Sequence, residues 1–185
     1  HVFEGMVGHY LAIYCGAEIA YAESPFTVAN NMKEVRPTVM ASVPRLYEMM
    51  HDKILKGVRD SPPIKQKIFN WAVNVGKKKS QAIQRGESPN LILSLKDSVA
   101  NKLVFSKVKE ATGGRLRFFV SGGALLPQAI AEFFHAAGIL ILEGYGLTEA
   151  SPVITANSEH HFKFGTVGHP LPSVEVKIAE DGEIL

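Results

Sequence analysis

The chain has 185 residues, of which 46% are hydrophobic and 21% charged, and its net charge is +2. This length allows one domain with a substantial core, and the composition is that of an ordinary globular protein. The single cysteine, Cys15, excludes a disulfide framework and favours a reducing compartment. We expect a buried structural thiol there. No apolar run reaches the ~18 residues that a membrane-spanning helix needs.

Hydrophobic periodicity predicts alternating helices and strands over the first 140 or so residues. Prolines mark helix starts at Pro44, Pro63 and Pro127, and Gly113-Gly114 ends a helix. We expect Thr27 to cap the helix that follows it. The predicted helices cover 3–15, 27–35, 44–54, 61–83, 93–111 and 127–137, and the predicted strands cover 18–22, 38–43, 116–121 and the residues from 139.

This alternation indicates an α/β protein with a parallel sheet flanked by helices. The continuous apolar run at 118–120 predicts a strand that is buried on both faces. After Pro152 the helical signal fades, and short strands are expected at 153–156, 166–168 and 174–178. The predicted organisation is therefore an α/β subdomain over residues 1–151, followed by the start of a β-rich subdomain over residues 152–185.

Two glycine blocks follow predicted strands. The more informative one comes after the apolar run 138–142 and reads Glu143-Gly144-Tyr145-Gly146-Leu147-Thr148-Glu149. Glycine lets the backbone approach a ligand, the threonine hydroxyl can bond a phosphate oxygen, and the last carboxylate can hold Mg²⁺. The other block, Ser121-Gly122-Gly123-Ala124, follows strand 116–121. Ligands bind beyond the carboxyl ends of parallel strands, so the blocks predict one binding site; the alternative is two turns with incidental polar residues.

These blocks resemble two signatures of the adenylate-forming enzymes: the acyl-CoA synthetases, the firefly-type luciferases and the adenylation modules of nonribosomal peptide synthesis. Tyr145 to Glu149 match the Tyr-Gly-x-Thr-Glu signature, and Ser121 to Pro127 look like the adenine-binding loop at about the family's spacing. His1-Val2-Phe3-Glu4 resembles the end of the Leu-Pro-x-x-His segment and, with the following Gly-His-Tyr, suggests the long-chain fatty acid–CoA ligase branch. The resemblance covers the whole chain and implies part of the large N-terminal domain.

The resemblance implies a reaction in which a fatty acid and ATP form an acyl-adenylate that is then transferred to CoA, with Mg²⁺ as the metal. Such chemistry needs charge neutralisation and fixed geometry rather than a nucleophile. The implied catalytic residues are Thr148, at the α-phosphate, and Glu149, which binds the metal. Tyr145 would stack on adenine, and Gly144 would both contribute to nucleotide binding and line the acyl tunnel. The other implied residues are Gly122, Gly123, Ala124, Glu143 and Gly146 at the nucleotide, and His1 at the acyl and CoA tunnel.

Other family motifs are absent from this sequence: the phosphate loop, the ribose-binding aspartate, and the hinge and lysine of the C-terminal lid. Both ends of the chain look cut, and we expect the 185 residues alone to be inactive. Two alternatives remain open. One is adenylation of a different carboxylic acid, and the other is a non-catalytic relative that binds lipid or membrane. An amino-acid substrate is disfavoured, because His1 to Glu4 lack the aspartate that such modules use for the amine.

The middle of the chain is basic, since residues 53–117 hold fifteen Lys and Arg against four Asp and Glu. Both an anionic partner and a solvated helical face agree with this pattern. Helix 62–85 carries Trp71 on an apolar face beside lysines, which is typical of an interfacial helix or of a helix packed on its own core. We expect a cytoplasmic protein, with peripheral membrane contact through this helix and a homodimer as open alternatives. Zinc is not expected, because His160 and His161 are adjacent and lack further ligands. Nucleic acid is not expected either, because the basic residues have no interleaved aromatic platform.

Overall fold

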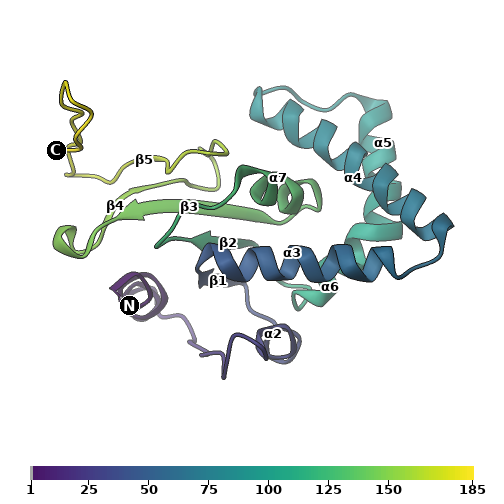
Figure 1. Cartoon of the computed structure of the whole chain (residues 1–185), viewed down its shortest axis with the longest axis horizontal. Coiled ribbons are helices and arrows are strands. Elements are labelled where there is room, and N and C mark those ends of the chain that lie inside the picture. The colour runs from purple at the N-terminus through teal and green to yellow at the C-terminus, as the bar shows by residue number, and fades with distance from the viewer. Residues whose placement is uncertain (1) are drawn as a thin grey trace.

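The computed structural model describes residues 2–185 and contains a five-stranded mixed sheet (Figure 1). The strand order is β1-β2-β3-β4-β5; the first three strands run parallel and the last two pair antiparallel. The expected α/β fold with a parallel sheet and flanking helices is therefore confirmed, with an antiparallel extension at one side. The strands are β1 (Val39–Ser42), β2 (Phe118–Ser121), β3 (Leu140–Gly146), β4 (Val153–Ala156) and β5 (His169–Pro170).

The helices start and end close to the proline and glycine positions that the sequence singled out. Pro44 and Pro63 each occupy the first turn of a helix, where a missing N–H donor has no consequence. The segments are η1 (Glu4–Tyr10), α1 (Leu11–Tyr14), α2 (Val28–Val35), α3 (Pro44–Arg59), α4 (Pro63–Gln84), α5 (Leu91–Ala100), η2 (Asn101–Phe105), α6 (Ser106–Ala111), α7 (Gln128–Ala136) and η3 (Thr148–Ala150).

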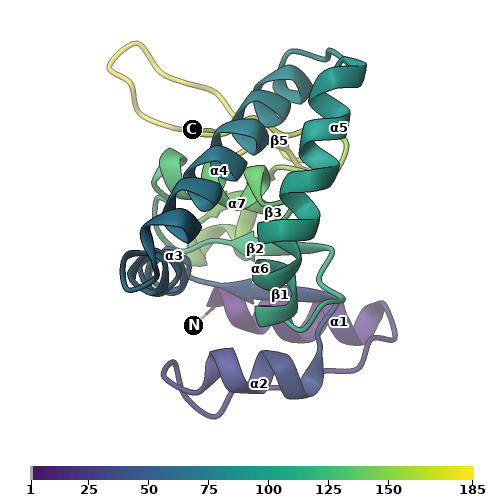
Figure 2. The ribbon, with the colours of Figure 1, turned by 90° about the vertical axis from the view of Figure 1, so that its right-hand side faces the viewer.

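The helices stack outward from the sheet in successive layers. Helix α7 packs against β3, α4 packs against α7, and α5 packs against α4. Gly76 on α4 permits the close approach to α7, because a Cβ there would overlap the backbone of Ala136. The N-terminal helices and α2 lie beneath β1 in Figure 2, with η1 in contact with β1. None of the helices within residues 2–185 has both the length and the apolar content needed to cross a bilayer.

The core lies between the sheet and helices α3 and α7. Phe119 on β2 is fully buried and contacts the rings of Tyr47 on α3 and Phe134 on α7. The Tyr47 hydroxyl donates a 2.7 Å hydrogen bond to the carbonyl of Val120. Burial raises the pKa of Tyr47 far above its usual range, so the hydroxyl stays neutral and remains a donor. This contact fixes α3 to the strand that leads into the first glycine block.

Some local expectations are wrong. Residues 18–22 form no strand; Tyr21 is 62% exposed, and the segment has no strand partner for its amides. Cys15 is exposed rather than buried, because it ends α1, whose Tyr14 is also largely exposed. Thr27 precedes α2, but its hydroxyl bonds Ser24 and caps no helical amide.

The C-terminal segment contains less regular structure than expected. The predicted strand at 153–156 is confirmed as β4, but no strands form at 166–168 or 174–178. Only the two-residue β5 and an isolated bridge between Ile178 and Ile184 are present there. The division of the chain at residue 152 stays a prediction, although β4 pairs directly with β3 in the same sheet.

Candidate functional site

The two glycine blocks lie side by side at the carboxyl ends of β2 and β3. These strands are parallel neighbours, with Ser121 opposite Glu143 in the register. Gly122 and Gly144 are the next residues on each strand. A pair of adjacent parallel strand ends is where α/β sheets bind ligands, so the arrangement that the sequence predicted is present.

The opening segment of the chain reaches the same edge of the sheet. Gly122 is buried beneath the ring of Phe3, and a Cβ at Gly122 would lie 2.7 Å from that ring. Gly123 is exposed and has φ of +81°, a conformation that favours glycine over other residues. Ala124 is exposed beside it. His1 lies outside the described residues. Phe3, two residues later, lies against Gly122 and so brings the start of the chain next to the first glycine block.

The glycines of the second block have a structural neighbour in β4. A Cβ at Gly144 would lie 3.3 Å from the Thr155 carbonyl oxygen, and a Cβ at Gly146 would overlap the Pro152 carbonyl oxygen. The β3–β4 register shifts between Tyr145 and Gly146, as at a β-bulge. These glycines belong to the end of a strand within a hairpin. Packing within the hairpin is by itself sufficient to require glycine at position 146.

The polar residues at the end of the second block, Thr148 and Glu149, are open to solvent. Tyr145 is half-buried on β3, whereas Thr148 and Glu149 are exposed on the single turn of η3. The Glu149 carboxylate forms no ion pair with any residue in the described part of the chain. It is therefore accessible to a cation, and the exposed Thr148 beside it is accessible to a phosphate group.

The donor set suits Mg²⁺ better than a transition metal. No group of three or more His, Cys, Asp or Glu side chains in residues 2–185 is placed to hold a metal. Mg²⁺ is commonly held by one or two carboxylates together with substrate phosphates and water. One accessible carboxylate, Glu149, fits that pattern when a nucleotide supplies the remaining oxygens. His160 and His161 are both exposed and belong to no such group.

Glu143 differs from the other predicted site residues because its side chain lies inside the protein. It is only 6% exposed. Burial raises the pKa of Glu143 above its usual value, and the backbone amides of Leu126 and Gly165 act against that rise. The Glu143 side chain is therefore largely shielded from solvent, unlike those of Thr148 and Glu149.

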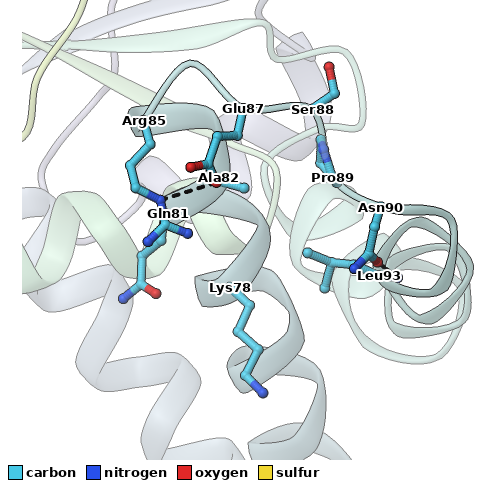
Figure 3. A pocket seen from close by; sticks show the side chains of 9 residues that line it. All are labelled: Lys78, Gln81, Ala82, Arg85, Glu87, Ser88, Pro89, Asn90 and Leu93. Carbon is cyan, nitrogen blue, oxygen red and sulfur yellow. Dashed lines mark hydrogen bonds and ion pairs between the residues drawn. The ribbon is translucent and has the colours of Figure 1, made fainter.

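Two surface hollows lie away from these strand ends. One, of about 420 Å³, lies between the end of α4 and the loop leading to α5, and Lys78 and Asn90 are among its lining residues (Figure 3). Arg85 in this hollow pairs with Glu87 at 3.3 Å, which offsets its charge. The other, of about 290 Å³, lies between α4, α7 and Lys163. Neither hollow includes a residue of the glycine blocks.

Comparison with known families decides the broader assignment. The family model described as "AMP-binding enzyme" matches residues 1–185. The chain belongs to the AMP-binding enzyme family. In this family the chain resembles the long-chain-fatty-acid–CoA ligase FadD15 of Mycobacterium bovis, with 39% identity over 150 residues, 81% of this chain and 24% of that protein. It also resembles the peroxisomal long chain acyl-CoA synthetase 7 of Arabidopsis thaliana, with 34% identity over 186 residues, 100% of this chain and 25% of that protein.

Solved structures support the fold of this AMP-binding enzyme segment. The anthranilate CoA ligase AuaEII in complex with anthranoyl-AMP matches all of the chain and 27% of its own, with a TM-score of 0.57 and 18% identity. ATP-bound MatB from Rhodopseudomonas palustris gives the same TM-score and coverage at 20% identity. The chain spans about a quarter to a third of the length of the curated relatives. The family and the fold are therefore established.

Proposed function

We propose that the protein containing this chain is an AMP-forming long-chain fatty acid–CoA ligase. The observation that carries the proposal is the pair of glycine-bearing strand ends, Gly122-Gly123 and Gly144–Gly146, with Thr148 and Glu149 exposed beside them. The names of the sequence relatives, which are fatty acid–CoA ligases and long-chain acyl-CoA synthetases, support the substrate class.

In this proposal the reaction joins two anions, a carboxylate and the α-phosphate of ATP. Thr148 would donate a hydrogen bond to the α-phosphate, and Glu149 would hold Mg²⁺, which would supply neutralisation of the phosphate charge. Tyr145 stacks on the adenine, and the backbone of Gly122, Gly123 and Ala124 covers the other face of the base. The fatty acid carboxylate attacks the α-phosphorus and pyrophosphate leaves. The CoA sulfur then attacks the acyl carbon of the acyl-adenylate, the thiol proton is released, and AMP leaves as its bond to the acyl carbon breaks.

The main alternative is the same reaction on another carboxylic acid. Among the solved structures with this fold, one is named an anthranilate CoA ligase and another a benzoate CoA ligase. A panel of acids in ATP–pyrophosphate exchange with the full-length protein separates the two. We expect exchange to be fastest with a long-chain fatty acid. A faster exchange with aryl or short-chain acids would overturn the substrate class and leave the adenylation chemistry in place.

Contact with an anionic lipid surface is a second proposal. Helix α5 suits this contact better than α4, the helix that was expected at 62–85. On α4, Ala72 and Val75 are buried, and Lys79 is paired with Asp97 at 2.6 Å. These side chains already make contacts within the protein, so they are not available to a lipid surface. Helix α5 and η2 instead carry an outward apolar stripe that consists of Leu91, Ile92, Leu95, Val99 and Leu103, all at least 50% exposed.

The charges around this α5 stripe favour anionic lipid over other occupants. Lys96 and Lys102 are exposed on the same helical segment, and Asp97, the acidic residue of α5, is neutralised by Lys79. An apolar stripe with flanking lysines is the pattern of a helix that lies in a membrane interface. The stripe thus offers the apolar area, and Lys96 and Lys102 beside it offer the positive charge, for binding to an anionic membrane surface.

The Ile92→Ser, Leu95→Ser double variant tests the membrane proposal. Burial of each side chain is worth about 1.5–3 kcal/mol, so we expect at least about a tenfold loss of binding to vesicles of phosphatidylcholine and phosphatidylserine in a sedimentation assay. Ile64→Ser, at a residue that is 73% exposed on α4, is the matched control and should change little. Equal binding by the double variant and the control would exclude the α5 stripe as the contact.

A further inference from the structure

The smaller of the two surface hollows, of about 290 Å³, brings together three segments that are distant in sequence. Its walls come from the C-terminal part of α4, from α7 and from the segment between β4 and β5. Pockets for drug-sized ligands usually have volumes of about 300–1,000 Å³, so this hollow has room for a small chemical group. It includes no residue of the glycine blocks and is therefore separate from the strand-end site.

Positive charge predominates around this hollow. Lys77, Arg85 and Lys163 line it together with one carboxylate, that of Glu132. Arg85 is paired with Glu87 at 3.3 Å. Lys77 and Lys163 are exposed and form no ion pair with any other residue between 2 and 185. The hollow therefore holds two unpaired ammonium groups, and these outnumber its carboxylate.

Amide side chains beside the lysines are held by hydrogen bonds. Gln128 Nε2 donates to Glu132 Oε1 at 2.7 Å, so the carboxylate that would oppose an anion already has a donor. The backbone N–H of Phe164 donates to Gln84 Oε1 at 3.4 Å. This bond uses the oxygen of Gln84 and leaves its NH₂ group as a donor for another acceptor.

The most buried lining residues are Ser80 and Phe164, which are only 5% and 9% exposed. Ser80 Oγ lies 2.7 Å from His135 Nδ1, and the rings of Phe162 and Phe164 each lie 5.3 Å from the His135 ring. Burial lowers the pKa of His135 to about 4, so the ring is neutral at pH 7. When its proton is on Nδ1, the ring donates to Ser80 Oγ and leaves the serine O–H to donate into the hollow.

We propose that this hollow binds a phosphate group, with Lys77 and Lys163 as its cations and the Ser80 hydroxyl at its base. Phosphate oxygens are charged acceptors, and the ammonium, hydroxyl and amide groups gathered here are donors. The inference goes beyond the proposed function, because the hollow shares no residue with the strand-end site. A soluble phosphate compound and a phospholipid headgroup both carry this group.

The Lys77→Gln, Lys163→Gln double variant of the full-length protein tests the site with inorganic phosphate. In the wild type we expect phosphate to slow hydrogen exchange in residues 77–85 and 163–165. Exposed ion pairs are individually weak, so we expect the apparent Kd for phosphate, measured from this slowing, to rise about three- to tenfold in the variant. The matched control, Lys65→Gln with Lys67→Gln, removes the same charge from exposed positions on α4 outside the hollow and should change the Kd by less than about twofold.

Vesicles distinguish the two sources of the phosphate group. Phosphatidylcholine vesicles that contain phosphatidic acid present a phosphate monoester at a surface, and sedimentation measures their binding. A larger loss of vesicle binding in the Lys77, Lys163 variant than in the control would assign the site to a lipid headgroup. Equal vesicle binding by the two variants, together with weakened binding of inorganic phosphate in the first, would assign it to a soluble phosphate compound.

Two results would contradict the phosphate site. One is the same Kd for inorganic phosphate in both double variants, which would show that the lysines act only through general charge. The other is unchanged hydrogen exchange around the hollow when phosphate is added to the wild type. ATP–pyrophosphate exchange should stay at the wild-type rate in both double variants, so failure of this site would leave the proposed function intact.

Discussion

In the full-length protein, Glu149→Ala is expected to lower Mg²⁺-dependent ATP–pyrophosphate exchange by about 10²–10³-fold. The reason is that the exposed Glu149 carboxylate, which has no ion-pair partner among residues 2–185, is the group that would hold the cation against the phosphates. Metal stabilisation of transition-state charge is worth several kcal/mol. Binding of the fatty acid should change by no more than about threefold, because exposed substitutions away from a contact stay within about 0.5 kcal/mol.

Two matched variants test whether the loss of exchange comes from the loss of metal binding. Glu149→Asp keeps a carboxylate on the same turn and should recover part of the exchange as the Mg²⁺ concentration is raised. Glu175→Ala removes an exposed carboxylate elsewhere and should behave as the wild type. If Glu149→Ala kept near-normal exchange at low Mg²⁺, Glu149 would have no role at the metal.

The sequence was sufficient to predict the framework of this site, because the framework follows from local patterns. The apolar run at 118–120 and the one before Glu143 identify β2 and β3, and Pro127 identifies the helix α7 between them. A parallel topology then brings the strand ends to one edge. The adjacency of Gly122 and Gly144 follows from those rules, and the register confirms it.

Features that depend on distant segments could not be predicted. Glu143 is only 6% exposed, and the amides that act on its pKa belong to Leu126 and Gly165, which are 17 and 22 residues away along the chain; no local pattern encodes that meeting. The strand expected at 18–22 failed for the same reason, since apolar residues form a strand only where a partner edge is available. Cys15 was wrongly predicted to be buried, because periodicity identifies a helix without showing which face of it another element covers.

The second glycine block also shows how one residue type serves two demands. The sequence suggested that Gly144 and Gly146 let a ligand approach, whereas the structure adds the backbone of β4 as a neighbour of both. These explanations differ in what substitution would do. Hairpin packing predicts a loss of stability, and ligand approach predicts a loss of binding with stability unchanged.

Gly146→Ala is therefore expected to destabilise the protein by about 3 kcal/mol, the upper end of the usual cost of overpacking. The added methyl would overlap the Pro152 carbonyl oxygen, which is backbone and can move only if the β3–β4 hairpin opens. The movement would also displace η3, so pyrophosphate exchange should fall together with the unfolding midpoint. Denaturant unfolding of the full-length variant measures the first effect and exchange kinetics the second.

Two other glycines give the comparison that decides between the explanations. Gly57→Ala lies on α3 with nothing within 4 Å of the new methyl, and it should raise stability by about 0.5–1 kcal/mol. Gly144→Ala would place its methyl 3.3 Å from the Thr155 carbonyl oxygen and 3.9 Å from the Ala156 Cβ. It should therefore cost less stability than Gly146→Ala while weakening the use of the fatty acid if Gly144 lines the acyl path. A stable but inactive Gly146→Ala would reverse the roles, because the ligand rather than the hairpin would then be what requires glycine at that position.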